Sequence, residues 1–212
     1  MKAKAISLLR PLADSFLYVL LFLLCIAAAT VLFTLIGLPG LAAPGAATLG
    51  VYALYRITKH RRVDIKERFS LKPLTARDIT LIVAVAVPVT LLVQSVQFIV
   101  PPQYLTEAPQ FEMQYGAFSV FTTVIASPIA EEIFFRGFIF KRLCASYHPA
   151  IAVLIASFMF SGMHPGELWS FMAMLISVFY SVLFLKYKSV YAPITAHITS
   201  NFIAVCFNFM FN

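Results

Sequence analysis

The sequence predicts an all-α membrane protein: a single domain over residues 1–212, folded as a polytopic bundle of transmembrane helices. Of the 212 residues, 61% are hydrophobic and only 12% are charged, and the mean hydropathy is +0.89. Soluble domains are about 45–50% apolar and about 25% charged. This composition excludes a soluble globular enzyme and a disordered regulator. The length of the uncharged segments and the distribution of basic residues predict about seven spans.

The predicted spans are taken in order along the chain. The first, 16–38, has 23 residues without a charge, which at about 1.5 Å per residue cross a hydrocarbon core of about 30 Å. A signal peptide is the alternative there, but its apolar region would be only about 7–15 residues long. The second segment, 41–55, is interrupted by Pro44 and Gly45 and gives the weakest prediction. The other five segments are 79–100, 117–140, 149–163, 168–185 and 190–211.

The basic residues support this number of crossings. The segments expected on one side of the membrane are 1–15, 56–78, 136–148 and 186–189, and they contain all 16 lysines and arginines. Basic loops remain in the cytoplasm, so the N-terminus is expected inside the cell and the C-terminus outside. The net charge of +7 then lies in loops beside anionic lipid head groups, and nucleic acid is not expected as a partner.

Polar and ionisable residues inside the spans are the candidates for function. A charge at the bilayer centre costs about 2.5–3.5 kcal/mol, and such residues usually face a protein interior or a water-filled cavity. The candidates are Glu131, Glu132, Arg136, His164, His197 and Asn201.

The two adjacent glutamates are expected to have different roles. Glu132 and Arg136 lie one helical turn apart and can form an ion pair, whereas Glu131 points about 100° away around the helix. Glu132 is therefore expected to be structural and Glu131 to be free for chemistry. The alternative is that both carboxylates mark a helix end near the cytoplasm. Pro128 has no N–H, so the carbonyl of Val124 is expected to be free and the helix to bend there.

The two histidines come from other spans. Pro165 disfavours helix at His164, so His164 is expected to end the fifth span. His197 and Asn201 share one face of the last span. The alternative for His164 is a histidine at the membrane interface. The alternative for His197 and Asn201 is a hydrogen-bonded packing pair. Along its helix, Glu131 lies about 15 Å from the cytoplasmic end, and His197 lies about 14 Å from the cytoplasmic end of its own helix. His164 lies about 22 Å from the cytoplasmic end of the fifth helix. The three meet only if the fifth helix is tilted or starts deeper.

These residues suit hydrolysis in a hydrated cavity. Glu131 is expected to act as a general base on water, and His164 to hold that water or move its proton. His197 and Asn201 are expected to donate hydrogen bonds to the oxyanion of a tetrahedral intermediate, where one donor is worth about 2.7–4 kcal/mol. No serine or cysteine has the neighbouring base that an activated nucleophile requires.

Zinc is the alternative to catalysis without a metal. Two histidines and a glutamate form a known catalytic zinc set, so Glu131, His164 and His197 are the expected ligands if zinc is present. The HExxH spacing, which places two histidines on one helical face, is absent from the sequence. Catalysis without a metal is therefore preferred, and no cofactor is expected.

Three short blocks resemble the motifs of a known family. They are EExxxR (Glu131, Glu132, Arg136), FxxxH (Phe160, His164) and HxxxN (His197, Asn201), in this order and on separate predicted spans. Each block alone is a weak pattern. Together they resemble the CAAX-processing and bacteriocin-processing (CPBP) intramembrane endopeptidases, which include the type II CAAX prenyl proteases. The resemblance covers residues 117–205, the predicted catalytic core.

The resemblance implies an intramembrane protease that acts on a peptide or membrane-protein substrate. It assigns water activation to Glu131 and His164, the oxyanion site to His197 and Asn201, and supporting roles to Glu132, Arg136 and Phe160. The family has been described both as metalloproteases and as glutamate-dependent proteases, so the resemblance leaves the metal open. Eukaryotic members cut prenylated C-terminal tails, and bacterial members are linked to peptide maturation or bacteriocin immunity. The short loops favour a bacterial cell membrane.

Two other classes of function are considered. One is a non-catalytic bacteriocin-immunity or partner-regulating membrane protein of the same fold. The other is a proton-coupled transporter, because carboxylates and histidines also form proton relays. Transporters often carry inverted repeats, and the sequence contains none that we detect. No oligomeric state is predicted.

Overall fold

The computed structural model describes residues 2–37, 50, 52, 56, 64–101, 120–164 and 166–211. Within these residues all regular secondary structure is helical, which confirms the all-α prediction. Most of the predicted second span, 41–55, lies outside the described residues, as do residues 117–119 of the predicted core.

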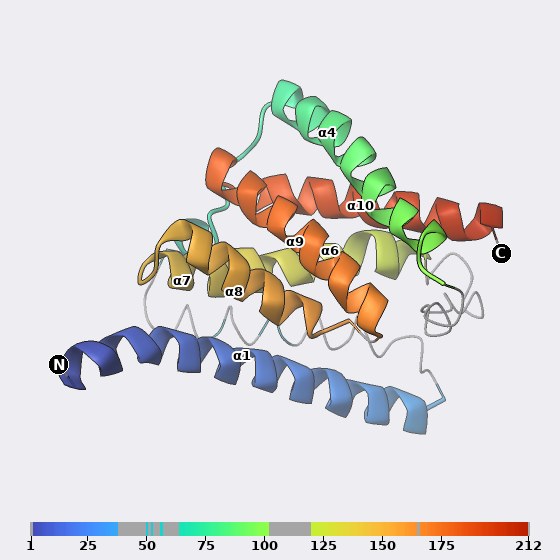
Figure 1. Cartoon of the computed structure of the whole chain (residues 1–212). Helices are drawn as coiled ribbons and strands as arrows, with labels where there is room; N and C mark the ends of the chain where they lie inside the picture. The colour runs from blue at the N-terminus through green and yellow to red at the C-terminus, as the bar shows by residue number, and fades with distance from the viewer. Residues whose placement is uncertain are drawn as a thin grey trace.

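The bundle is formed by long helical stretches that follow the predicted spans (Figure 1). Helix α1 is Lys2–Leu35, and α4 is Ala76–Gln94, followed by the short 3-10 helix η2, Ser95–Phe98. A continuous stretch then contains the π-helix η5 (Thr122–Ala126), α6 (Ser127–Glu132), the π-helix η6 (Ile133–Phe140) and α7 (Lys141–Cys144). The last helices are α8 (Pro149–Ser161), α9 (Glu167–Tyr187) and α10 (Tyr191–Phe211). A single turn, α3 (Ile65–Arg68), precedes α4.

The chain is an integral membrane protein by the length and surface of its helices. Three segments of the described chain are long and apolar enough to cross a membrane: Leu9–Leu35, Ala76–Phe98 and Glu167–Tyr187. Large apolar side chains also cover the outer surface; Leu24 on α1 is 56% exposed and Leu92 on α4 is 71% exposed. Such a surface is suited to lipid rather than to water. The count of seven spans and the cytoplasmic N-terminus remain predictions.

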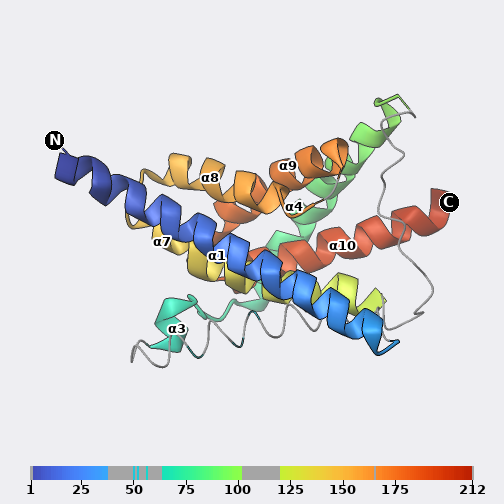
Figure 2. The same ribbon diagram turned by 90° about the horizontal axis from the view of Figure 1, so that it is seen from below.

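Helices α1 and α4 lie on opposite flanks, with the remaining helices between them (Figure 1). The two termini lie at opposite ends of the bundle in both views (Figures 1 and 2). Aromatic rings join α1 to η6: Phe22 stacks on Phe134 with ring centroids 4.4 Å apart, and Tyr18 meets Phe138 edge-on at 4.8 Å. These contacts hold α1 beside the segment that carries the two glutamates.

The face of α4 that points inward becomes more polar toward its C-terminal end. The helix begins with a capping box in which Thr75 and Asp78 bond each other's backbone N–H groups. Its buried residues recur every fourth position, Ile82, Ala86, Thr90 and Gln94, so they form one stripe. Thr90 in this stripe forms a 2.7 Å hydrogen bond with Ser200 of α10. The stripe therefore brings α4 and α10 together beside the predicted site.

A π-turn changes the backbone just before the glutamates. The N–H of Ser127 donates to the carbonyl of Thr122, five residues earlier, rather than to Thr123. The next residue, Pro128, has no N–H, so the carbonyl of Thr123 has no helical partner. The side chain of Asn201 donates to it at 2.9 Å. The sequence predicted a free carbonyl at Val124 from regular α-helical spacing; the carbonyl that binds another helix is one residue earlier, because the spacing is π-helical.

Candidate active site

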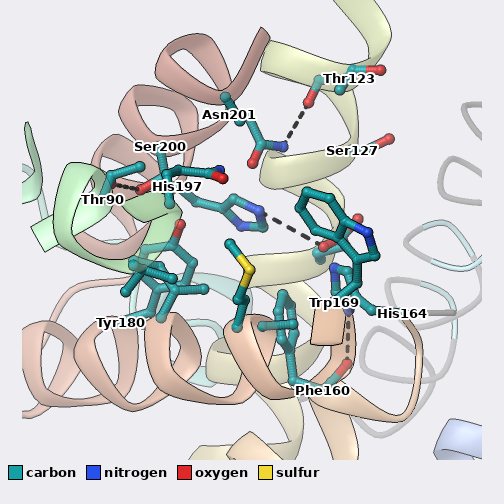
Figure 3. A pocket seen from close by; sticks show the side chains of 17 residues that line it. Thr90, Thr123, Ser127, Phe160, His164, Trp169, Tyr180, His197, Ser200 and Asn201 are labelled. Carbon is teal, nitrogen blue, oxygen red and sulfur yellow. Dashed lines mark hydrogen bonds and ion pairs between the residues drawn. The ribbon is translucent and has the colours of Figure 1, made fainter. Parts of the chain in front are cut away.

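A cavity of about 300 Å³ lies between α4, η5, α6, α8, α9 and α10 (Figure 3). All four predicted catalytic residues line it: Glu131, His164, His197 and Asn201. Phe160 of the predicted supporting residues lines it as well. Tyr180 and Thr90 lie at one side of the view and Trp169 and His164 at the other, with His197 between them. The structure thus brings the three motifs to one place inside the bundle.

His164 lines the cavity from the turn that follows α8, which is two residues shorter than the predicted span 149–163. The helix ends at Ser161, and the following turn is closed by the N–H of His164, which donates to the carbonyl of Ser161 at 3.0 Å. The imidazole turns back along α8, and its Nδ1 lies 3.1 Å from the carbonyl oxygen of Phe160. The predicted mismatch in depth assumed that the helix continues to His164. In the structure, His164 nevertheless lines the same cavity as Glu131 and His197.

The hydrogen bond to Phe160 assigns the protons of the His164 ring. A carbonyl oxygen only accepts hydrogen bonds, so Nδ1 of His164 carries the hydrogen. In the neutral ring, Nε2 then has a free lone pair. His164 can therefore accept a hydrogen bond from water in the cavity.

Glu132 and Arg136 form the predicted ion pair, and both side chains are fully buried. Nη1 of Arg136 lies 2.9 Å from Oε1 of Glu132. Nη2 of Arg136 donates to the carbonyl oxygen of Ser177 at 3.0 Å and to its hydroxyl at 2.6 Å. Nδ1 of His197 lies 2.9 Å from the same Oε1 of Glu132. The pair therefore joins the α6–η6 stretch to both α9 and α10.

Aromatic rings fix the plane of the His197 imidazole. Tyr180 stacks on it with centroids 4.8 Å apart and planes inclined by 28°, and Phe160 meets it edge-on at 5.9 Å. The guanidinium of Arg136 lies 4.8 Å from the centroid of the Phe160 ring, a cation–π arrangement. The Tyr180 hydroxyl lies near Ser200. Phe160 and Tyr180 thus hold the ring of His197 and the charge of Arg136 in position.

Glu131 is in a different environment from its neighbour. Its side chain is 26% exposed, and Oε2 lies 4.0 Å from Nε2 of His197. Glu131 also lines a second cavity of about 120 Å³, which extends toward Phe22 and Ile26 of α1. A gap of 4.0 Å is too long for a direct hydrogen bond and can be bridged by a water molecule. The unpaired carboxylate that the sequence predicted therefore faces open space.

Asn201 is fixed by one bond and keeps a second donor. Its Nδ2 donates to the carbonyl of Thr123 at 2.9 Å. A side-chain amide has two N–H groups, so this bond uses one of them. The other remains for a ligand in the cavity.

The zinc alternative can be tested against this arrangement. His164 and His197 each direct Nδ1 to an acceptor oxygen, which is the pattern found behind zinc-bound histidines. However, no three histidine, cysteine, aspartate or glutamate side chains of the described chain lie close enough together to hold a metal ion. Glu131, His164 and His197 do not fit a zinc site as they are arranged.

Several polar residues of the site were missed by sequence reasoning: Thr90, Thr123, Trp169, Ser177, Tyr180 and Ser200. The prediction rests on ionisable residues and Asn201 inside the spans. Neutral polar residues at helical spacing would have identified several of them. Ser177, Tyr180 and Ser181 are three and four residues apart within an apolar span and are all buried, and Ser200 is adjacent to Asn201.

Comparison with known proteins finds one family to which the region around this site is similar. Residues 113–203 match the family model described as type II CAAX prenyl endopeptidase Rce1-like. The matched region contains all seven residues of the three motifs. None of the curated proteins matches the chain, and neither does any solved structure. Residues 113–203 of the chain are therefore similar to the CAAX prenyl endopeptidases, the family that the three motifs predicted.

Proposed function

We propose that the protein is an intramembrane endopeptidase of the CAAX type, active in a bacterial cell membrane, which hydrolyses a peptide bond with water activated by Glu131. One observation carries this proposal: the region that matches the family gathers a carboxylate, two imidazoles and an amide around one cavity. The apolar outer surface of the bundle supports a substrate that enters from the bilayer. No metal is part of the proposal.

The proposed reaction begins with a water molecule between Glu131 and His164. Glu131 removes one proton as the water oxygen attacks the carbonyl carbon of the peptide, and the C=O bond becomes a C–O⁻ single bond. The lone pair on Nε2 of His164 accepts the second hydrogen of this water and orients it. Collapse of the intermediate breaks the C–N bond. The proton held by Glu131 then goes to the leaving amine.

The negative oxygen of the intermediate is proposed to accept hydrogen bonds from His197 and Asn201. Nδ1 of His197 donates to the carboxylate of Glu132, so Nε2 can donate only when the ring is protonated. Glu131, Glu132 and Arg136 together carry two negative charges and one positive charge. A protonated His197 would balance this sum, and an unbalanced buried charge is costly. The free N–H of Asn201 supplies the second donor.

Cleavage of defined peptides tests this function. Purified protein in lipid nanodiscs is incubated with a fluorogenic peptide that ends in a CAAX sequence, with and without a farnesyl group. We expect cleavage by the wild-type protein and a loss of about 10³-fold or more in Glu131→Gln, because general base catalysis contributes about 10²–10⁴-fold. The control is Glu67→Gln, the same change at an exposed residue outside the cavity, which should retain full activity.

The outcomes also address the alternative of a non-catalytic immunity or partner-regulating protein. A folded wild-type protein that cleaves neither peptide, or a Glu131→Gln protein as active as the wild type, would contradict the proposal. Cleavage of only the farnesylated peptide would identify a prenylated substrate. Cleavage of both would indicate that the enzyme reads the peptide alone.

A further inference from the structure

Trp169 has a buried donor without a partner in the candidate site. It is the only tryptophan in the chain, and its indole lines the same cavity as Glu131 and His197 (Figure 3). Its Nε1 is inaccessible to solvent and has no hydrogen-bond partner in the part of the chain that the structure describes. Buried polar groups in native proteins are nearly always hydrogen-bonded. Since the described residues supply no acceptor, this N–H indicates a place for a bound group that does.

The backbone around Trp169 is held firmly in place. The hydroxyl of Ser170 lies 3.1 Å from the carbonyl oxygen of Ser161 and 2.6 Å from that of His164. The N–H of Ser170 donates to the carbonyl of Gly166 at 2.9 Å, and Gly166 has a φ of 85°, which favours glycine. The turn that brings His164 into the cavity therefore also fixes Trp169.

The chemistry of the indole restricts the kind of group it can bind. An indole N–H only donates hydrogen bonds, so its partner must present an acceptor. The polar groups of a peptide backbone that only accept are its carbonyl oxygens. Trp169 lies toward His164, across the view from Tyr180 (Figure 3). A peptide whose scissile bond lies at Glu131 would extend through the cavity, between the side that carries Trp169 and the side that carries Tyr180.

We propose that Trp169 is a substrate-binding residue whose indole N–H donates to a backbone carbonyl of the peptide, close to the bond that is cut. The inference rests on the proposed endopeptidase function and adds a contact from α9. It assigns this residue to the alignment of the peptide chain rather than to the activation of water. Its removal should therefore raise KM with little change in kcat.

The single tryptophan permits a test that removes one hydrogen. In a strain that cannot make tryptophan, 3-benzothienylalanine is incorporated in its place, and sulfur replaces the N–H in a ring of nearly the same shape. Trp169→Phe is the genetically encoded second variant. With the fluorogenic CAAX peptide, we expect KM to rise about two- to tenfold, the effect of one hydrogen bond, and kcat to change less than about twofold. An unchanged KM in both variants would overturn the proposal.

Peptide analogues identify the acceptor. Each backbone carbonyl near the scissile bond is replaced in turn by a methylene group. At one position, loss of the carbonyl should weaken binding of the peptide to the wild-type protein. The same change should not further weaken binding to the benzothienyl protein, which already lacks the N–H. Equal losses in both proteins at every position would contradict the proposal. A lower melting temperature of the substrate-free benzothienyl protein would also contradict it, because the N–H would then already have a partner in the resting protein.

Fluorescence of the single tryptophan separates failure of this inference from failure of the proposed function. The CAAX peptide is titrated into the Glu131→Gln protein, and the emission of Trp169 is recorded. A change in emission without turnover by the wild-type protein would support the contact and contradict the proposed chemistry. Turnover by the wild-type protein with no response of Trp169 would keep the chemistry and overturn the contact. Neither turnover nor response would contradict both.

Discussion

The site has two halves, which differ in how far they bury the two adjacent glutamates of α6. In the buried half, Glu132 is fully enclosed and bonded to Arg136 and His197. In the open half, Glu131 is 26% exposed, faces two cavities and lies 4.0 Å from the nearest ring nitrogen of His197. A rotation of about 100° along the helix separates them. The buried half can thus act as a rigid frame, while the open half keeps groups available for a substrate.

The largest predicted effect comes from breaking the buried half. Arg136→Ala leaves the carboxylate of Glu132 buried without its cation, and we expect a loss of about 3–5 kcal/mol in stability. Thermal unfolding in detergent measures this loss. The control is Arg142→Ala, because Arg142 pairs with Asp14 where both side chains are partly exposed, and such pairs are worth about 0–1 kcal/mol. Equal losses of stability in the two variants would show that burial does not increase the contribution of the Glu132–Arg136 pair.

The next effect concerns a donor of the open half. Asn201→Leu keeps the approximate size of the side chain and removes its N–H groups, and we expect kcat to fall about 10²–10³-fold, as for other oxyanion donors. KM should change little, because the bond forms with the intermediate. Steady-state kinetics with the CAAX peptide measure both constants. Phe202→Leu, at an exposed position on the same helix, is the control, and an equal decrease in both variants would contradict an oxyanion role for Asn201.

A smaller change tests how the frame supports the open half. Tyr180→Phe retains the ring stacked on His197 and removes only the hydroxyl that lies near Ser200. We expect a loss of about 0.5–1.5 kcal/mol in stability, with kcat reduced less than in Asn201→Leu. Tyr191→Phe, whose ring is exposed, should have no effect. If Tyr180→Phe matches Asn201→Leu in kcat, the hydroxyl takes part in the reaction and the division into halves is wrong.

The smallest predicted effect is that of metal removal. His164 and His197 are oriented as zinc-bound histidines often are, but they and Glu131 do not form a compact ligand group. We therefore expect a chelator to leave peptide cleavage unchanged. Stoichiometric zinc in the purified protein, lost together with activity and restored by added zinc, would replace general base catalysis by metal catalysis.

The features that were predicted correctly from the sequence are local. The pairing of Glu132 with Arg136 follows from helical spacing alone, and so does the common location of His197 and Asn201. The bond between His197 and Glu132 was not predicted, because spacing within one helix does not specify which neighbouring helix its side chains meet. Pro165 predicted that the fifth helix ends near His164, but the sequence did not indicate that the imidazole turns back along α8, or that a π-turn frees the Thr123 carbonyl.

The most direct test of the account compares Glu131→Gln with Glu132→Gln in the same preparation, with the cleavage rate and melting temperature of each. We predict that Glu131→Gln loses about 10³-fold or more in rate and melts like the wild type, whereas Glu132→Gln melts at a lower temperature because its ion pair is broken. A Glu131→Gln protein that cleaves at the wild-type rate, or that is destabilised as much as Glu132→Gln, would contradict the division between a catalytic and a structural glutamate.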